Sequence, residues 1–147
     1  MSSLLSSDPV SMPPRTADLE IVVMLFDRAI AALTRAIEHC RRHQIEARFE
    51  ALVEAGECIG TLAEGLNPEA TDDWSRQTAA LYSGALSRIA LANVRNDEGK
   101  AEQVMALLEP LRLSWRTLLA DARLREAKLP GVAISLTVPN EAVLAAD

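Results

Sequence analysis

Apolar residues recur at spacings of three and four positions through four successive stretches of this 147-residue chain. That period matches the turn of an α-helix and predicts helices over about residues 18–43, 45–66, 73–95 and 97–128. Amphipathic helices with short connections bury their apolar stripes against one another, so we expect an all-α, antiparallel up-down four-helix bundle. Residues 1–147 then form a single domain, with the bundle over about 16–128 and flexible segments at 1–15 and 129–147.

The periodicity also predicts which side chains face the core. In the first two helices these are Leu19, Val22, Val23, Phe26, Ala29, Ile30, Leu33 and Ile37, then Ile45, Phe49, Leu52, Gly56, Ile59, Ala63 and Leu66. In the last two they are Trp74, Thr78, Leu81, Ala85, Ile89 and Ala92, then Ala101, Val104, Leu108, Leu111, Trp115, Leu118 and Ala122. We expect Thr16 or Asp18 to cap the first helix, Asp72 or Asp73 to cap the third, and Pro110 to bend the fourth.

Composition and charge exclude several classes of function. The net charge of −6 argues against nucleic acid as a partner, because phosphate binding depends on lysine and arginine. The longest uncharged apolar run covers residues 21–26, whereas a membrane-spanning helix needs about 20 apolar residues, so we expect no membrane insertion. The first residues do not show the basic stretch followed by an apolar one that marks a secretory signal, so we expect none. With two cysteines and no such signal, a reducing cytoplasmic location is expected.

Residues that could carry catalysis or bind a metal are few. His39 and His43 are four positions apart, but Ala36 and Cys40 stand where a di-iron bundle would carry the glutamates of its Glu-x-x-His motifs. In an antiparallel hairpin, Cys40 and Cys58 would lie ~15 Å apart along the bundle axis, too far for a disulfide. We therefore expect buried free thiols, no metal, no cofactor, no catalytic residue and no enzymatic activity.

Three of the helices carry a second strip beside the core stripe. Its members are Ile21, Leu25, Arg28 and Ala32, then Ala51, Ala55, Cys58 and Leu62, then Ala79, Tyr82, Leu86, Ala90 and Asn93. One interpretation is a wide core stripe, which is common in bundles. The other is a groove for a partner helix, in which small alanines allow close approach and larger side chains fill pockets.

The stretch LYSGALSRIALANVRND, residues 81–97, resembles the signature of the flagellin-specific export chaperone family FliS. Positions that match the family pattern are Leu81, Tyr82, Arg88, Ala92, Asn93, Asn96 and Asp97, with Thr16, Ala17, Met24, Leu25, Asp27 and Ala29 upstream and Leu107, Leu108, Leu111, Arg112 and Trp115 downstream. The chain departs from the pattern where Phe26 replaces a tyrosine, Arg28 a glycine and Asp18 a Ser-Pro cap, and in having Pro110 in the fourth helix.

The resemblance implies a cytoplasmic chaperone that binds the disordered C-terminal segment of flagellin, prevents its premature polymerisation and aids its delivery to the export apparatus. Export gate proteins would be further partners. Candidate partner-binding residues are Ile21, Leu25, Arg28, Tyr82, Leu86, Ile89 and Asn93. Two other classes stay open: a helical scaffold or regulator with a different protein partner, and a metal-binding bundle enzyme.

The polar end of the signature and the two chain ends give further expectations. Asn96 and Asp97 can end one helix and start the next, while Asn93 can bond the turn between them or meet the backbone of a partner. By the resemblance, residues 2–13 would cover the groove in the absence of a partner. Residues 132–138 alternate in polarity like a strand, and this segment either stays disordered or docks in an extended form.

Overall fold

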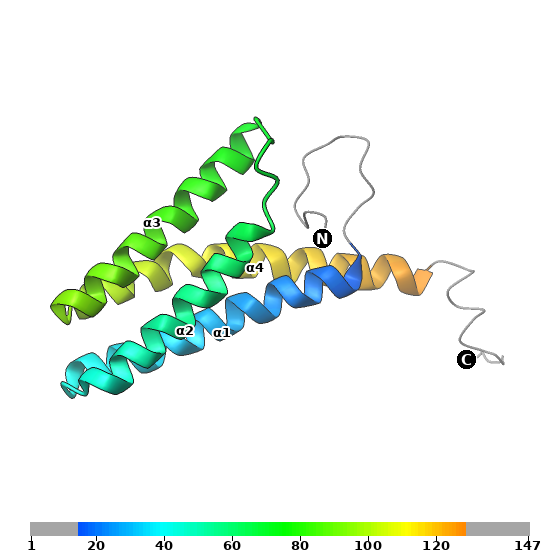
Figure 1. Cartoon of the computed structure of the whole chain (residues 1–147). Coiled ribbons are helices and arrows are strands. Elements are labelled where there is room, and N and C mark those ends of the chain that lie inside the picture. Colours follow the sequence, from blue (N-terminus) through cyan, green and yellow to red (C-terminus); the bar gives the residue numbers. More distant parts are fainter. Residues whose placement is uncertain (1–14, 129–147) are drawn as a thin grey trace, which may run out of the picture.

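The structure is a computed structural model that describes residues 15–128. This part of the chain contains four α-helices joined by short connections. These are α1 (Thr16–Arg41), α2 (Ile45–Glu64), α3 (Asp73–Arg95) and α4 (Glu98–Lys128). They form an elongated antiparallel up-down bundle, which confirms the expected fold class (Figure 1). The hypotheses on residues 2–13 and 132–138 concern segments outside the described residues.

The four helices form a closed ring in which each one packs on two neighbours. Helix α1 packs on α2 and α4, and α3 packs on the same two helices, while α1 and α3 lie at opposite corners of the ring. The packing of α3 is the less extensive. Figure 1 shows why: α3 is inclined, so that its beginning, near the loop from α2, stands away from the other helices. The inclination opens one end of the bundle.

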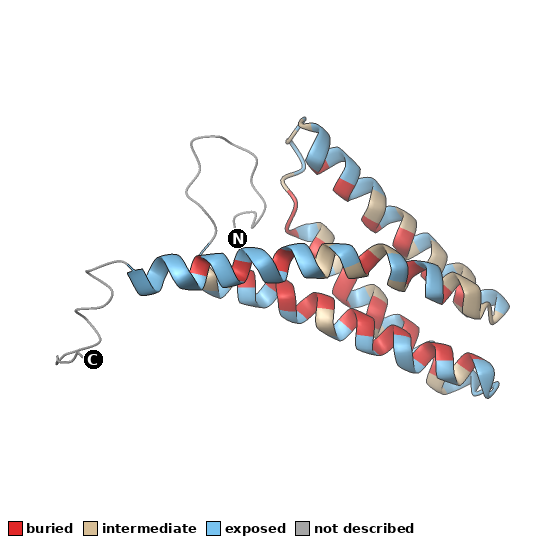
Figure 2. Cartoon of the chain, turned by 180° about the vertical axis from the view of Figure 1, so that it is seen from behind, coloured by how far each residue is buried: buried red, intermediate tan, exposed pale blue. Residues whose placement is uncertain are grey.

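Buried residues, red in Figure 2, lie along the inward faces of the helices. All eight residues expected in the core stripe of α1 are buried. The expected stripe of α2 was partly wrong, because Ile45 and Phe49 are 66% and 55% exposed. Leu52 and Ile59 are buried as expected, and they are joined in the core by Ala51, Ala55, Cys58 and Leu62. On α2, therefore, the second strip is part of a wide core stripe that faces α1.

Two further core expectations fail near the open end of the bundle. Trp74 is 46% exposed, because it belongs to the first turn of the inclined α3. Leu118 of α4 is 49% exposed, and its neighbour Leu119 is buried instead. Successive positions of a helix point about 100° apart, so a prediction that is wrong by one residue places the wrong one of two adjacent leucines in the core.

The helix ends follow the expected capping chemistry in α3 but not in α1. The carboxylate of Asp72 accepts a hydrogen bond from the Ser75 amide at 3.0 Å and caps α3. Helix α1 instead starts after Arg15 with no side-chain cap, so the prediction of a Thr16 or Asp18 cap was wrong. The Thr16 hydroxyl is engaged by Glu126 of α4. Helix α4 continues unbroken through Pro110, which lies on its exposed side.

Both cysteines are buried free thiols, as the register of the hairpin predicted. Burial raises the pKa of the Cys40 thiol, although the nearby Arg48 guanidinium opposes this effect. Burial likewise raises the pKa of the Cys58 thiol. Both side chains therefore serve as small apolar core residues rather than reactive nucleophiles.

Candidate partner-binding cleft

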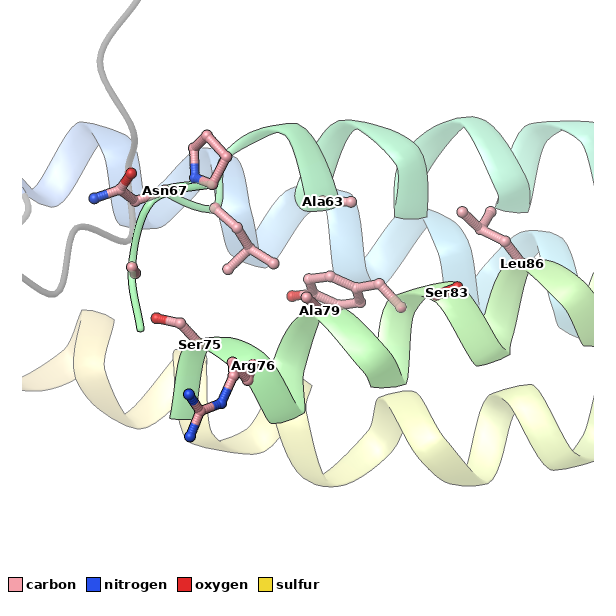
Figure 3. Close-up of a pocket in the computed structure, with 11 residues that line it drawn as sticks. Ala63, Asn67, Ser75, Arg76, Ala79, Ser83 and Leu86 are labelled. Atoms are coloured by element: carbon pink, nitrogen blue, oxygen red, sulfur yellow. The ribbon is translucent and has the colours of Figure 1, made fainter. Parts of the chain in front are cut away.

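A cleft of about 420 Å³ opens between the end of α2 and the beginning of α3. Its walls come from Ala63 of α2, the loop residues 66–70, and α3 from Ser75 to Leu86. Figure 3 shows Ala79, Ser83 and Leu86 along α3, with Ala63 across from them. Because most of these side chains are small, the two helices leave space between them instead of closing on each other. We call this space the α2–α3 cleft.

Tyr82 lies in the wall of the α2–α3 cleft and is only 1% exposed. Its hydroxyl has no hydrogen-bond partner among the residues that the structure describes. Burial raises the pKa of this hydroxyl to about 12, because the phenolate would be poorly solvated. A buried donor without a partner is unusual and destabilising, which makes Tyr82 the chemically distinctive group of the cleft.

The structure distributes the seven sequence-predicted residues over two opposite helices. Tyr82 and Leu86 both line the α2–α3 cleft. Ile89 is buried, and so is Leu25 of α1, and both belong to the common core. Ile21 of α1 is 47% exposed. The seven residues are thus divided between two helices that lie at opposite corners of the ring.

The remaining two predicted residues are held by polar contacts. Arg28 of α1 lies 3.7 Å from the Glu54 carboxylate of α2, which also pairs with Arg35 at 2.7 Å. The guanidinium is therefore turned toward α2 and joins the two helices. Asn93 of α3 presents its main-chain carbonyl to Arg48, while its buried Oδ1 has no partner within the described part of the chain.

The far end of α3 is fastened by Arg48, a buried cation that the periodicity analysis did not single out. Its Nη1 donates to Asn96 Oδ1 at 2.5 Å, and its Nη2 donates to the Asn93 carbonyl at 2.6 Å. Asn96 in turn donates from Nδ2 to the Cys40 carbonyl at 3.4 Å. Three helices, α1, α2 and α3, are thus joined at one end of the bundle. Arg48 lies one turn before Leu52, so its position in the core stripe was readable from the sequence.

The polar end of the signature has a structural role in the turn between α3 and α4. Asn96 ends α3 in a left-handed conformation with φ of 51°, which asparagine adopts more readily than most residues. Asp97 Oδ1 accepts a hydrogen bond from the Lys100 amide at 3.2 Å and so supports the first turn of α4. The expectation that both residues stop one helix and start the next is confirmed.

Ion pairs fasten α4 to α1 along the opposite side of the bundle. Arg112 bonds Asp27 at 3.2 Å and Glu109 at 2.9 Å, and these hydrogen bonds raise the pKa of its guanidinium. Arg41 bonds Glu98 at 2.8 Å, which raises the pKa of Arg41 in the same way. Arg123 and Glu20 pair at 2.8 Å toward the other end, so ion pairs join α1 and α4 along their length, in contrast to the open α2–α3 cleft.

Two further features of the described residues concern metal ions and membranes. Within residues 15–128, no three His, Cys, Asp or Glu side chains gather in a way that could hold a metal ion. His39 instead shares a hydrogen bond of 2.7 Å with Gln44 at the turn from α1 to α2. Among the described helices, none is long and apolar enough to cross a membrane.

Comparison with known proteins adds a family. The family model described as flagellar protein FliS matches residues 15–122, nearly the whole bundle. The chain is 31% identical over 110 residues to the flagellar secretion chaperone FliS of Salmonella typhimurium, covering 74% of this chain and 82% of that protein. It is also 31% identical over 106 residues to the protein of the same name from Escherichia coli, covering 71% and 78% of the two chains.

Proposed function

Because the chain belongs to the FliS family of flagellar proteins, we propose that it is a cytoplasmic chaperone for flagellin. In this proposal it binds the C-terminal segment of newly made flagellin, which prevents premature polymerisation, and then aids delivery of flagellin to the export apparatus. Export gate proteins are its further partners. No catalytic step is involved, since holding the segment is sufficient.

The observation that best supports partner binding is the α2–α3 cleft with its unpartnered Tyr82 hydroxyl. Leu86 lines the same cleft and is only partly buried, so it offers apolar surface to a ligand. A disordered segment that folds on binding loses conformational entropy, commonly about 2–5 kcal/mol or more, and needs a large interface to offset this loss. In this proposal the surface beside the inclined α3 contributes to that interface.

Of the seven residues proposed from the sequence, the structure favours Leu86 as the one that meets flagellin directly. Tyr82 contributes from the wall of the cleft. Leu25 and Ile89 act as core supports, and Ile21 offers exposed apolar surface on α1. Arg28 and Asn93 act through the polar contacts that hold α1 to α2 and α3 to Arg48.

Isothermal titration calorimetry with two forms of flagellin tests the proposal. Full-length flagellin should bind, and flagellin without its C-terminal segment should not. Leu86→Asp should weaken binding, because it places a charge in an apolar cleft. The matched control is Leu113→Asp, which changes a leucine that is 56% exposed on α4. Circular dichroism verifies that both variants remain helical.

Three outcomes would contradict the proposal or part of it. If neither form of flagellin binds, the chain is better explained as a helical scaffold or regulator with another partner. If both forms bind equally, the C-terminal segment is not the ligand. If Leu86→Asp is folded and binds as tightly as Leu113→Asp, the α2–α3 cleft is not the binding site.

A further inference from the structure

The α2–α3 cleft continues along α2 as a strip of apolar and small residues. These share one face of the helix at helical spacing and are Ile45, Phe49, Val53, Gly56, Gly60 and Ala63. Ala63 lines the cleft, and a Cβ atom placed on Gly56 would lie 3.9 Å from Leu86 Cδ2 of α3, so the strip faces the α3 side. Ile45, Phe49 and Val53 are 66%, 55% and 38% exposed. We call this surface the α2 strip.

Two glycines in the middle of the α2 strip are not required by packing within the described chain. A Cβ atom at Gly60 would meet nothing within 4 Å, and the one at Gly56 would make only an ordinary contact. Neither glycine has a positive φ angle. Glycine inside a helix costs about 1 kcal/mol relative to alanine, so both positions would be more stable with a side chain. What the glycines do provide is a low surface that another helix backbone can approach closely.

The buried Tyr82 hydroxyl is a second, independent observation that points to a ligand at this surface. It is 99% buried, it lines the cleft into which the α2 strip runs, and it has no hydrogen-bond partner among residues 15–128. An acceptor brought by a ligand would satisfy it. The last carbonyl groups of a helix are acceptors of this kind, because they have no partner within their own helix.

The charge beside the α2 strip indicates the chemistry of the partner. Glu46, Glu50, Glu57 and Glu64 are exposed along the solvent edge of the strip. None of these four carboxylates pairs with a cation in the described part of the protein. Across the cleft the cation Arg76 is held by Asp73 at 2.5 Å. The edge on α2 is therefore an uncompensated acidic row, which attracts lysine and arginine side chains.

We propose that the α2 strip and the α2–α3 cleft together bind one partner helix of defined character. Its contact face carries small residues where it crosses Gly56 and Gly60, and lysine or arginine flanks that face above the acidic row. Its last turn supplies a carbonyl acceptor to the Tyr82 hydroxyl. The inference rests on the proposed function in one respect: the helix is formed by the flagellin segment when it folds on this surface.

Two variants and two matched controls test the inference by calorimetric titration with flagellin. Gly60→Leu fills the open surface and should weaken binding about tenfold or more, whereas Ala106→Leu adds the same side chain on the exposed face of α4 and should not. Glu57→Lys reverses one charge of the acidic row and should weaken binding several-fold at low salt, with a smaller effect at high salt. Asp121→Lys makes the same charge change on α4 and should leave binding unchanged.

The outcomes separate this inference from the proposed function. If flagellin binds the wild-type chain, and also binds the folded Gly60→Leu and Glu57→Lys variants equally well, the α2 strip is not the site, although the chaperone function stands. If flagellin does not bind the wild type, the proposed function fails, and the strip is tested with a synthetic amphipathic helix that has alanine on its contact face and lysine on its flank. Binding of that peptide to the wild type but not to Gly60→Leu supports the strip, and its failure to bind the wild type overturns it.

Discussion

Replacing Gly60 by alanine should make the free protein more stable. The backbone at this position is helical, and an added Cβ atom meets no described atom within 4 Å, so no clash opposes the change. Alanine also restricts the unfolded chain more than glycine does. The open space in the folded helix and the restriction of the unfolded chain therefore both allow the free energy of unfolding to rise. The prediction is informative because it tests directly whether the surface beside Gly60 is open in the free protein.

The expected gain is about 1 kcal/mol in the free energy of unfolding, which is the helix-propensity difference between glycine and alanine. For a chain of 147 residues, with an unfolding entropy near 2.1 cal/mol/K per residue, this corresponds to a rise of about 3 °C in Tm. Gly56→Ala should give a similar gain, because its Cβ atom would make an ordinary contact with Leu86 at 3.9 Å.

Urea unfolding followed by circular dichroism measures the change, with Gly84→Ala as the matched control in α3. There the Cβ atom would lie 3.0 Å from Arg88 Nη1, which donates to the Gly84 carbonyl at 3.1 Å. Since Arg88 must move and weaken that bond, the gain at Gly84 should be smaller. The reasoning is refuted if Gly60→Ala is neutral or destabilising, because the space beside Gly60 would then be occupied in the free protein.

Tyr82 is the single tyrosine, so the absorbance of its phenolate should titrate near pH 12, because burial raises its pKa from 10.0 to about 12 in the folded state. The contribution of the neutral hydroxyl to the free energy of unfolding is therefore fully present below pH 10 and should fall by about 2–3 kcal/mol between pH 10 and 12. Tyr82→Phe should abolish this loss. A midpoint near 10 would mean that water reaches the hydroxyl. Arg48→Ala should lower the free energy of unfolding in urea by about 2–4 kcal/mol, because Asn96 Oδ1 and the Asn93 carbonyl lose their donor; an unchanged midpoint would show that the network is not stabilising. Pro110→Ala should raise the free energy of unfolding by up to about 3 kcal/mol, because it restores a missing amide donor inside α4. Tm should rise with it, and a lower Tm would contradict this.

Local sequence information was sufficient for the helices and their order. Asp72 capping and the loop before it placed the start of α3, and Asn96 and Asp97 placed the turn into α4, because these side chains bond backbone groups only a few residues away. The all-α bundle follows from the four periodic segments, since each has an apolar stripe that only another helix can cover. The family signature in residues 81–97 added the class of protein, which periodicity alone cannot supply.

The rotation of α2 was decided by tertiary structure. Ile45 and Phe49 lie on a strip as apolar as the one that carries Ala51 and Leu62, so the sequence offers two possible core faces. Which face is buried depends on the neighbours, and α2 turns Leu62 and Ala51 toward α1 because α1 packs along its length. A propensity or a period describes one helix, whereas burial is a property of the pair.

The candidate site shows the same division. Tyr82 and Leu86 were recognised from the sequence, but the α2–α3 cleft exists because α3 is inclined away from the bundle, and no local pattern encodes that angle. Ile21 and Arg28 were placed in the same site by the sequence, yet they lie on α1, at the corner of the ring opposite α3. A sequence can show which faces are apolar, but only the packing of all four helices determines which of those faces stay open to a partner.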